Sequence, residues 1–164
     1  WIIMRLNQEV LGTRYGKLIE QPTTYPTIAC AAKLVCLMNE TSASDGDIFP
    51  HYFRKAGLGK LVGKRSWGGV VGISGRGPLT DGGSVSVPLT ATNDVDGGYV
   101  IEGYGVDPDV EVWQEPKATL EGRDQQLERG IEILLQEISE NPRVKPVRPA
   151  DPMKDKGSVR DYTK

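Results

Sequence analysis

Apolar residues recur at helical spacing near both ends of the chain. Residues 1–11 predict a helix that ends at Gly12, and a second helix is predicted from about Asp124 to Glu140. In each helix the apolar side chains share one face, so both helices are expected to be amphipathic. These apolar positions are Ile2, Ile3, Leu6, Val10 and Leu11 in the first helix, and Leu127, Ile131, Leu134, Leu135 and Ile138 in the second.

Short apolar runs separated by glycines fill the middle of the chain. Residues 33–39 have a continuous apolar centre, which predicts a strand covered on both faces, as in a parallel sheet. Residues 44–56 predict a helix, with Gly57 as its C-cap and Pro50 as the place of a kink. Further strands are predicted at residues 60–63, 69–73, 84–89, 99–101 and 110–112. This succession of strand, helix and strand predicts an α/β domain with a buried sheet.

Glycine and proline mark the predicted loops and the end of the folded unit. Residues 12–29 contain several of them and predict a connecting loop. After Asn141 the chain is rich in proline and charge, a composition that buries too little apolar area to order itself. We therefore expect a folded unit over residues 1–141 and a flexible tail over residues 142–164. Because the chain starts with Trp1 inside a predicted helix, we expect it to be cut from a longer chain.

Composition argues against several classes of function. The 164 residues carry a net charge of −2, which gives no electrostatic reason to expect nucleic acid or an anionic membrane as partner. No apolar run approaches the ~20 residues that a membrane-spanning helix needs. Cys30 and Cys36 are too few for a disulfide framework, and their spacing fits no common zinc site. We expect two reduced cysteines in a cytoplasmic protein.

The run NETSASDGDIF, at residues 39–49, joins the end of a predicted strand to the start of a predicted helix. A serine in this place has its hydroxyl at the edge of the sheet, where clefts form. The free N–H groups of the first helical turn can hold an oxyanion, and the helix dipole favours an alkoxide. Ser44 is therefore a candidate nucleophile. The same residues also fit an ordinary helix start, with Ser44 as N-cap and Asp45 and Asp47 as first-turn acids.

Four runs of the chain, taken in order, resemble tricorn-type serine peptidases, which are related to the C-terminal processing proteases. The runs are residues 39–49, 57–63, 65–72 and 102–109, and the resemblance extends over about residues 1–140. It makes Ser44 the nucleophile and the backbone N–H of Asp45 one oxyanion donor. It also implies an α/β sandwich similar to that of Clp protease and crotonase, of which this chain is the C-terminal part.

Two departures from the related families sharpen the expected site. Gly69 stands where the C-terminal processing branch has its lysine base, so the tricorn branch fits better. That branch uses a histidine from an upstream subdomain, supported by a serine and by a glutamate that matches Glu102. His51 is the only histidine of the sequence, and it lies about two helical turns after Ser44, so we expect it to point along the helix rather than back at the serine. We therefore expect the catalytic histidine to be missing from this chain, which alone should hydrolyse peptides poorly.

The resemblance implies a cytoplasmic serine peptidase that hydrolyses oligopeptides without metal or organic cofactor. It also implies a homo-oligomer for the full-length protein, with no nucleic acid or membrane partner. In the family that the chain resembles, an acidic residue before the serine run helps to select basic side chains at the cleavage point. The corresponding loop, residues 13–15, contains no acid, so the resemblance does not carry this specificity over to the chain. A catalytically inactive structural, oligomerisation or peptide-binding fragment is the alternative. A calcium module at residues 94–105 lacks the glutamate of the twelfth position, Gly105, so a turn is preferred there.

Overall fold

A computed structural model describes residues 1–16, 19–144 and 147–150 of the chain. The predicted tail therefore lies partly outside the described residues, at positions 145–146 and 151–164. Over the described ranges, no helix is long and apolar enough to cross a membrane.

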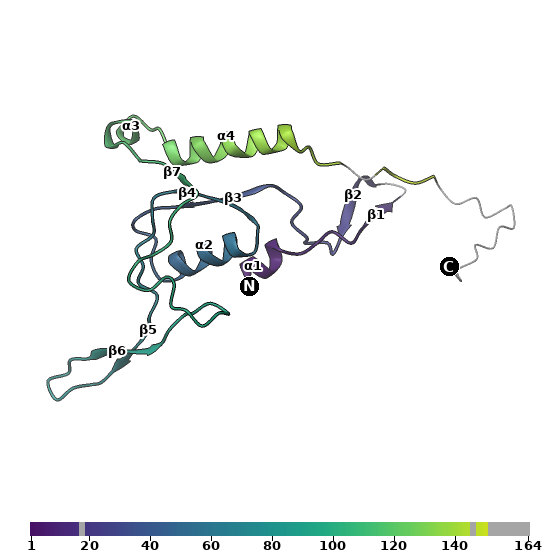
Figure 1. Ribbon diagram of the computed structural model, residues 1–164. Helices are drawn as coiled ribbons and strands as arrows, with labels where there is room; N and C mark the ends of the chain where they lie inside the picture. The colour runs from purple at the N-terminus through teal and green to yellow at the C-terminus, as the bar shows by residue number, and fades with distance from the viewer. Residues whose placement is uncertain (17–18, 145–146, 151–164) are drawn as a thin grey trace, which may run out of the picture.

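The central layer is a parallel sheet of three strands, in the order β3, β4 and β7. Strand β3 (Leu34–Met38) pairs along its length with β4 (Gly59–Gly63), and β4 pairs at its end with β7 (Val110–Glu111). Helix α2 (Asp45–Lys55) lies against one face of β3 and β4, and α4 (Gln125–Glu140) lies against the other (Figure 1). The prediction of a parallel strand covered on both faces is thus confirmed, and the fold is mixed α/β.

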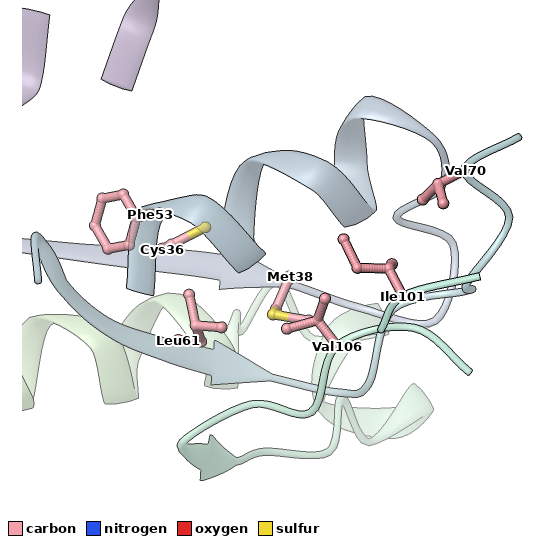
Figure 2. Close-up of a cluster of buried hydrophobic side chains, with 7 residues drawn as sticks. All are labelled: Cys36, Met38, Phe53, Leu61, Val70, Ile101 and Val106. Carbon is pink, nitrogen blue, oxygen red and sulfur yellow. The ribbon is translucent and has the colours of Figure 1, made fainter. Parts of the chain in front are cut away.

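A cluster of buried apolar side chains fills the space between the sheet and α2 (Figure 2). Leu61 of β4 is fully buried, and Phe53 of α2 is 2% exposed. The cluster comprises Cys36, Met38, Phe53, Leu61, Val70, Ile101 and Val106, so it joins the sheet and α2 to two later loops. Burial raises the pKa of the Cys36 thiol to about 11, which keeps it protonated and unreactive at neutral pH. Both cysteines are free, and Cys30 is half-buried.

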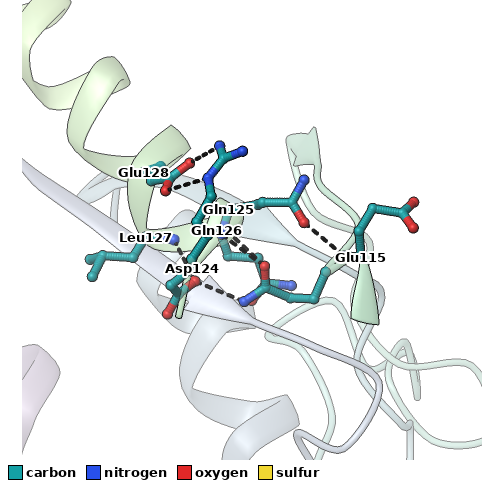
Figure 3. Close-up of polar contacts among 8 residues, drawn as sticks. Glu115, Asp124, Gln125, Gln126, Leu127 and Glu128 are labelled. Carbon is teal, nitrogen blue, oxygen red and sulfur yellow. Dashed lines mark hydrogen bonds and ion pairs between the residues drawn. The ribbon is translucent and has the colours of Figure 1, made fainter. Parts of the chain in front are cut away.

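Helix α4 begins in a network of side-chain and backbone hydrogen bonds (Figure 3). Asp124 accepts a hydrogen bond from the Leu127 N–H at 3.0 Å, which is an N-cap. Gln114 reaches this helix start by donating to Asp124 at 2.8 Å and accepting from the Gln125 N–H at 2.9 Å. The Glu115 N–H in turn donates to the side chain of Gln125 at 2.7 Å. The helix start is therefore tied to the chain that follows β7.

The face of α4 that meets the sheet differs from the predicted one. Its buried residues are Gln126, Gly130 and Ile133. A Cβ added at Gly130 would lie 3.1 Å from Leu37 and 3.4 Å from Val35, so the helix approaches β3 closely at this glycine. Four of the five residues predicted to form the buried apolar face are exposed instead, namely Leu127, Ile131, Leu135 and Ile138. The helix therefore approaches the sheet closely at Gly130, whereas most of the predicted apolar side chains stay exposed.

The predicted loop at residues 12–29 is wrong, because most of it forms an antiparallel hairpin. Strand β1 (Gly12–Gly16) pairs with β2 (Ile19–Tyr25), with Thr13 opposite Thr24. β-Branched and aromatic residues favour strands, and Pro22 is tolerated because a two-stranded sheet has only edge strands. Helix α1 (Ile2–Leu6) is accordingly shorter than predicted, since the Leu11 N–H already donates to the Tyr25 carbonyl.

A second antiparallel hairpin consists of β5 (Gly72–Arg76) and β6 (Val85–Thr90). The predicted strand at residues 69–73 begins late, at Gly72, because residues 69–71 bond to other parts of the chain. The predicted strand at residues 99–101 is wrong, since a turn starts at Ile101, whose carbonyl accepts the N–H of Tyr104. The short helix α3 (Pro116–Leu120) was not predicted.

Candidate active site

Ser44 occupies a strained turn between β3 and α2. Its backbone angles are φ 55° and ψ −111°, and it is the only non-glycine residue of the described ranges with a positive φ. Such a conformation costs a side-chain-bearing residue about 1–3 kcal/mol and persists only where the surroundings enforce it. A serine on a sharp strand-to-helix turn presents its hydroxyl outward, and Ser44 is exposed.

The small residues on either side make this turn possible. A Cβ added at Gly46 would lie only 3.3 Å from the Cβ of Ser42, so these two positions nearly touch across the turn. The hydroxyl of Ser42 accepts the Asn39 N–H at 3.1 Å, and its carbonyl accepts the Trp67 N–H at 2.8 Å. Ser42 therefore anchors the loop and leaves the outward position to Ser44.

Ser44 stands at the N-cap position of α2 but does not cap the helix with its side chain. Its own N–H donates to the carbonyl of Gly69 at 3.0 Å. The side chain of Asp47 does not reach back to this N–H, as a capping box would require, but accepts the Gly68 N–H at 2.7 Å. An ordinary helix start thus explains neither the backbone strain of Ser44 nor the absence of a capping hydrogen bond from its hydroxyl.

Asp45 begins α2 immediately after Ser44, and its N–H has no backbone acceptor among the described residues. An N–H of this kind, at the positive end of the helix dipole, can stabilise an oxyanion. Beside it lies a cavity of about 490 Å³ with a mostly apolar lining, formed by Trp1, Ile2, Ile3, Asp45, Ile48 and Phe49. Asp45 therefore carries an N–H without a backbone acceptor in the described residues, and it also lines the apolar cavity.

Glu102 is held by two backbone N–H groups. Its Oε2 accepts the N–H of Val70 at 2.7 Å and that of Val71 at 2.9 Å. Since Ser44 donates to the carbonyl of Gly69, Ser44 and Glu102 are bonded to consecutive residues of one segment. No hydrogen bond between Ser44 and Glu102 themselves is present in the described part of the chain, so a third group would have to connect them.

Position 69, where a lysine base of the C-terminal processing type would stand, is a glycine. A Cβ added there would overlap the exposed ring of Trp67, so a larger residue would require this ring to move. Lys64, a few residues earlier, is already engaged, because its ammonium pairs with Glu111 and lies 3.4 Å from the centre of the Trp113 ring. A serine–lysine dyad therefore finds no support at this position.

His51 lies on α2 and binds Asp94, a loop residue 43 positions further along the chain. Its Nε2 is 2.9 Å from Asp94 Oδ1, and Lys55 binds the other oxygen of the same carboxylate at 2.9 Å. Residues 94–98 form the expected turn, in which the Asp94 N–H donates to the Gly98 carbonyl at 3.1 Å. No cluster of metal-ligating side chains is found over the described ranges. His51 thus has a structural partner of its own.

Asp94 makes the stability of the fold depend on pH. The hydrogen bonds from His51 and then Lys55 lower the pKa of Asp94 below its ordinary value. The carboxylate therefore stabilises the folded state above about pH 4, and this contribution is lost as the pH falls through the lowered pKa. We expect the stability difference between wild type and Asp94→Asn to be present at neutral pH and to shrink below about pH 4. Urea unfolding across this range measures it. Asp96→Asn is the control in the same turn, and a difference that does not change with pH would contradict the prediction.

Comparison with known proteins shows the family of the chain. The family model described as "Peptidase family S41" matches residues 4–112, a range that includes Ser44, Asp45 and Glu102. The chain belongs to peptidase family S41. Among similar proteins, a "Tricorn protease" from Thermoplasma acidophilum is 44% identical over 126 residues, which is 77% of this chain and 12% of that protein. A "Putative Tricorn-like protease C-terminal subunit" from Sulfurisphaera tokodaii is 44% identical over 136 residues, 81% of this chain and 16% of that protein.

The fold is similar to that of a solved tricorn protease. The crystal structure of the tricorn protease superposes with a TM-score of 0.77 at 40% identity, covering 84% of this chain and 13% of that one. The resemblance to tricorn peptidases is thus confirmed. The chain spans only 12% and 16% of the length of the two curated relatives above, so it corresponds to a small part of each.

Proposed function

We propose that this chain carries the nucleophilic half of a tricorn-type serine peptidase site, in a sandwich of the Clp protease and crotonase type. The observation that carries the proposal is the strained, exposed Ser44, which does not cap α2 and stands beside the free N–H of Asp45. Membership of the S41 family and the similarity to tricorn protease support it. The substrates would be oligopeptides, the protein would be cytoplasmic and oligomeric, and no metal or organic cofactor is required.

In the proposed reaction the Ser44 oxygen attacks a peptide carbonyl. The oxyanion that forms is stabilised by the Asp45 N–H, and collapse of the intermediate releases the amine and leaves an acyl-enzyme that water hydrolyses. A serine needs an adjacent base, and His51 is bound to Asp94. We therefore place the base on a histidine of an upstream segment. Glu102, bonded to the residue next to Gly69, would orient that histidine and stabilise its charged form.

Labelling with a fluorophosphonate tests the proposal. We expect Ser44 of the full-length protein to be phosphonylated rapidly, and Ser44 of the isolated chain to react slowly, because the chain lacks the base. Peptide mapping by mass spectrometry identifies the modified residue. An unreactive Ser44 in the full-length protein would favour the alternative, a catalytically inactive structural, oligomerisation or peptide-binding fragment. Equally rapid labelling in both would show that no upstream base is needed.

Glu102 is expected to act through its charge rather than only through its hydrogen bonds to Val70 and Val71. We predict that Glu102→Ala and Glu102→Gln each lower kcat/KM of the full-length protein by about 100-fold. Only Glu102→Gln is expected to keep the melting temperature of the wild type, because an amide oxygen can still accept the two N–H groups. Glu128→Ala, which removes a surface carboxylate of α4, is the control. Full activity in Glu102→Gln would reduce Glu102 to a structural role.

A further inference from the structure

Asp47 is a buried carboxylate that the proposed reaction does not use. It lies in the first turn of α2 and is 0% exposed. Its Oδ1 accepts the Gly68 N–H at 2.7 Å, whereas its Oδ2 has no hydrogen-bond partner among the described residues. The sequence predicts only that Asp47 is an acid in the first turn of the helix. Its hydrogen bond to Gly68, 21 positions away, leaves no local signal in the sequence.

Such a carboxylate does little for the stability of the fold. Burying a charged group costs free energy unless hydrogen bonds satisfy both of its oxygens, and here only one is satisfied. A fold that buries a partly satisfied polar group is often less stable than the same fold with a neutral group of the same shape. Asp47 therefore matters less for stability than for the position of Gly68, whose N–H donates its single hydrogen bond.

That hydrogen bond holds residues 68–71, here called the anchoring segment. Gly68 accepts the Gly103 N–H at 2.7 Å, and Gly69 accepts the Ser44 N–H at 3.0 Å. The next two residues of the segment donate to Glu102. Strand β5 begins only after this segment, so no sheet ladder fixes it, and its two glycines give it a flexible backbone.

We propose that Asp47 is a positioning residue of the peptidase site, which sets the distance between Ser44 and Glu102 by fixing Gly68. It does not contact the reacting atoms. It acts from the same helical turn that follows Ser44, so the nucleophile and the anchoring segment are held by one rigid element. The inference rests on the proposed function, because only a peptidase site gives the separation of Ser44 and Glu102 a catalytic meaning.

The test compares Asp47→Ala with Asp47→Asn in the full-length protein. The measurement is fluorophosphonate labelling of Ser44, separated into reagent affinity and the rate constant of the bound step. We expect Asp47→Ala to lower that rate constant by about 100-fold with unchanged affinity, as displacement of catalytic groups does. Asp47→Asn, whose amide oxygen can accept the same N–H, is expected to recover the rate to within about tenfold of wild type. Its melting temperature should equal or exceed that of the wild type, since a neutral amide costs less to bury.

Asp109→Ala is the matched control. The carboxylate of Asp109 also accepts a backbone N–H, that of Leu61 at 2.8 Å. Leu61 lies in β4 and not in the anchoring segment. The Asp109→Ala variant should therefore be less stable than the wild type but label at Ser44 at the wild-type rate. Amide hydrogen exchange gives a second readout, because Gly68 should exchange faster in Asp47→Ala and at the wild-type rate in Asp47→Asn.

The outcomes separate this inference from the proposed function. A wild-type protein that labels rapidly, together with a folded Asp47→Ala that labels equally fast, overturns the role of Asp47 alone. A folded Asp47→Asn as slow as Asp47→Ala overturns it as well, because the hydrogen bond would then not be what matters. An unreactive wild-type Ser44 overturns the proposed function and, with it, the catalytic meaning of Asp47.

Discussion

Ser44→Ala is expected to abolish the peptidase activity of the full-length protein, lowering kcat/KM by ~10⁴-fold or more. The reason is chemical, since the proposed reaction has no other nucleophile at the turn between β3 and α2. The fold should be unaffected, because the hydroxyl of Ser44 makes no capping hydrogen bond that the substitution could remove. Peptide hydrolysis and thermal unfolding, measured on the same preparations, test both statements.

Ser42→Ala is the matched control for this prediction. Ser42 lies in the same loop, but its hydroxyl accepts the Asn39 N–H, so its loss should lower stability and leave most of the activity. Ser44→Gly adds a second check, because glycine adopts a φ of 55° without strain. This variant should be inactive and yet more stable than wild type by about 1 kcal/mol. Retained activity in Ser44→Ala would refute the assignment of the nucleophile.

Gly68→Ala is expected to destabilise the fold by about 3 kcal/mol or more and to disrupt the site with it. Gly68 has a φ of +89°, and an added Cβ would overlap the backbone nitrogen of Gly105. The methyl group cannot be accommodated by rotating a side chain, so the anchoring segment or the loop at residues 101–106 would have to move. Chemical denaturation measures the loss, and labelling of Ser44 should fall in parallel.

Gly97→Ala separates the two causes of this loss. Gly97 has a similar φ of +85°, but an added Cβ there meets nothing within 4 Å. It should therefore cost about 1 kcal/mol, the penalty of the backbone conformation alone. Equal destabilisation by the two substitutions would show that the close approach of Gly68 to Gly105 contributes nothing.

The central part of the fold was predictable because its signals are local. The apolar run of β3, the helical spacing of α2 and the glycines that bound them are read within a few residues, and the strand–Ser44–helix connection follows from their order. The hairpin of β1 and β2 was not predicted, because its glycines and prolines indicate a loop more strongly than its threonines indicate a strand. The exposed face of α4 was missed because helical spacing does not reveal which of two possible faces approaches a sheet most closely.

The sequence by itself determined that Ser44 would stand at the start of a helix after a buried strand, and the resemblance pointed to its role and to that of Glu102. Only the tertiary structure decided that Ser44 adopts a strained backbone, and that the carboxylates of Asp47 and Glu102 accept hydrogen bonds from the same anchoring segment. These hydrogen bonds join residues 21 and 32 positions apart in the chain. Periodicity describes neighbours along the chain, whereas a site of this kind is assembled by contacts between distant segments, which the packing of the folded chain brings together.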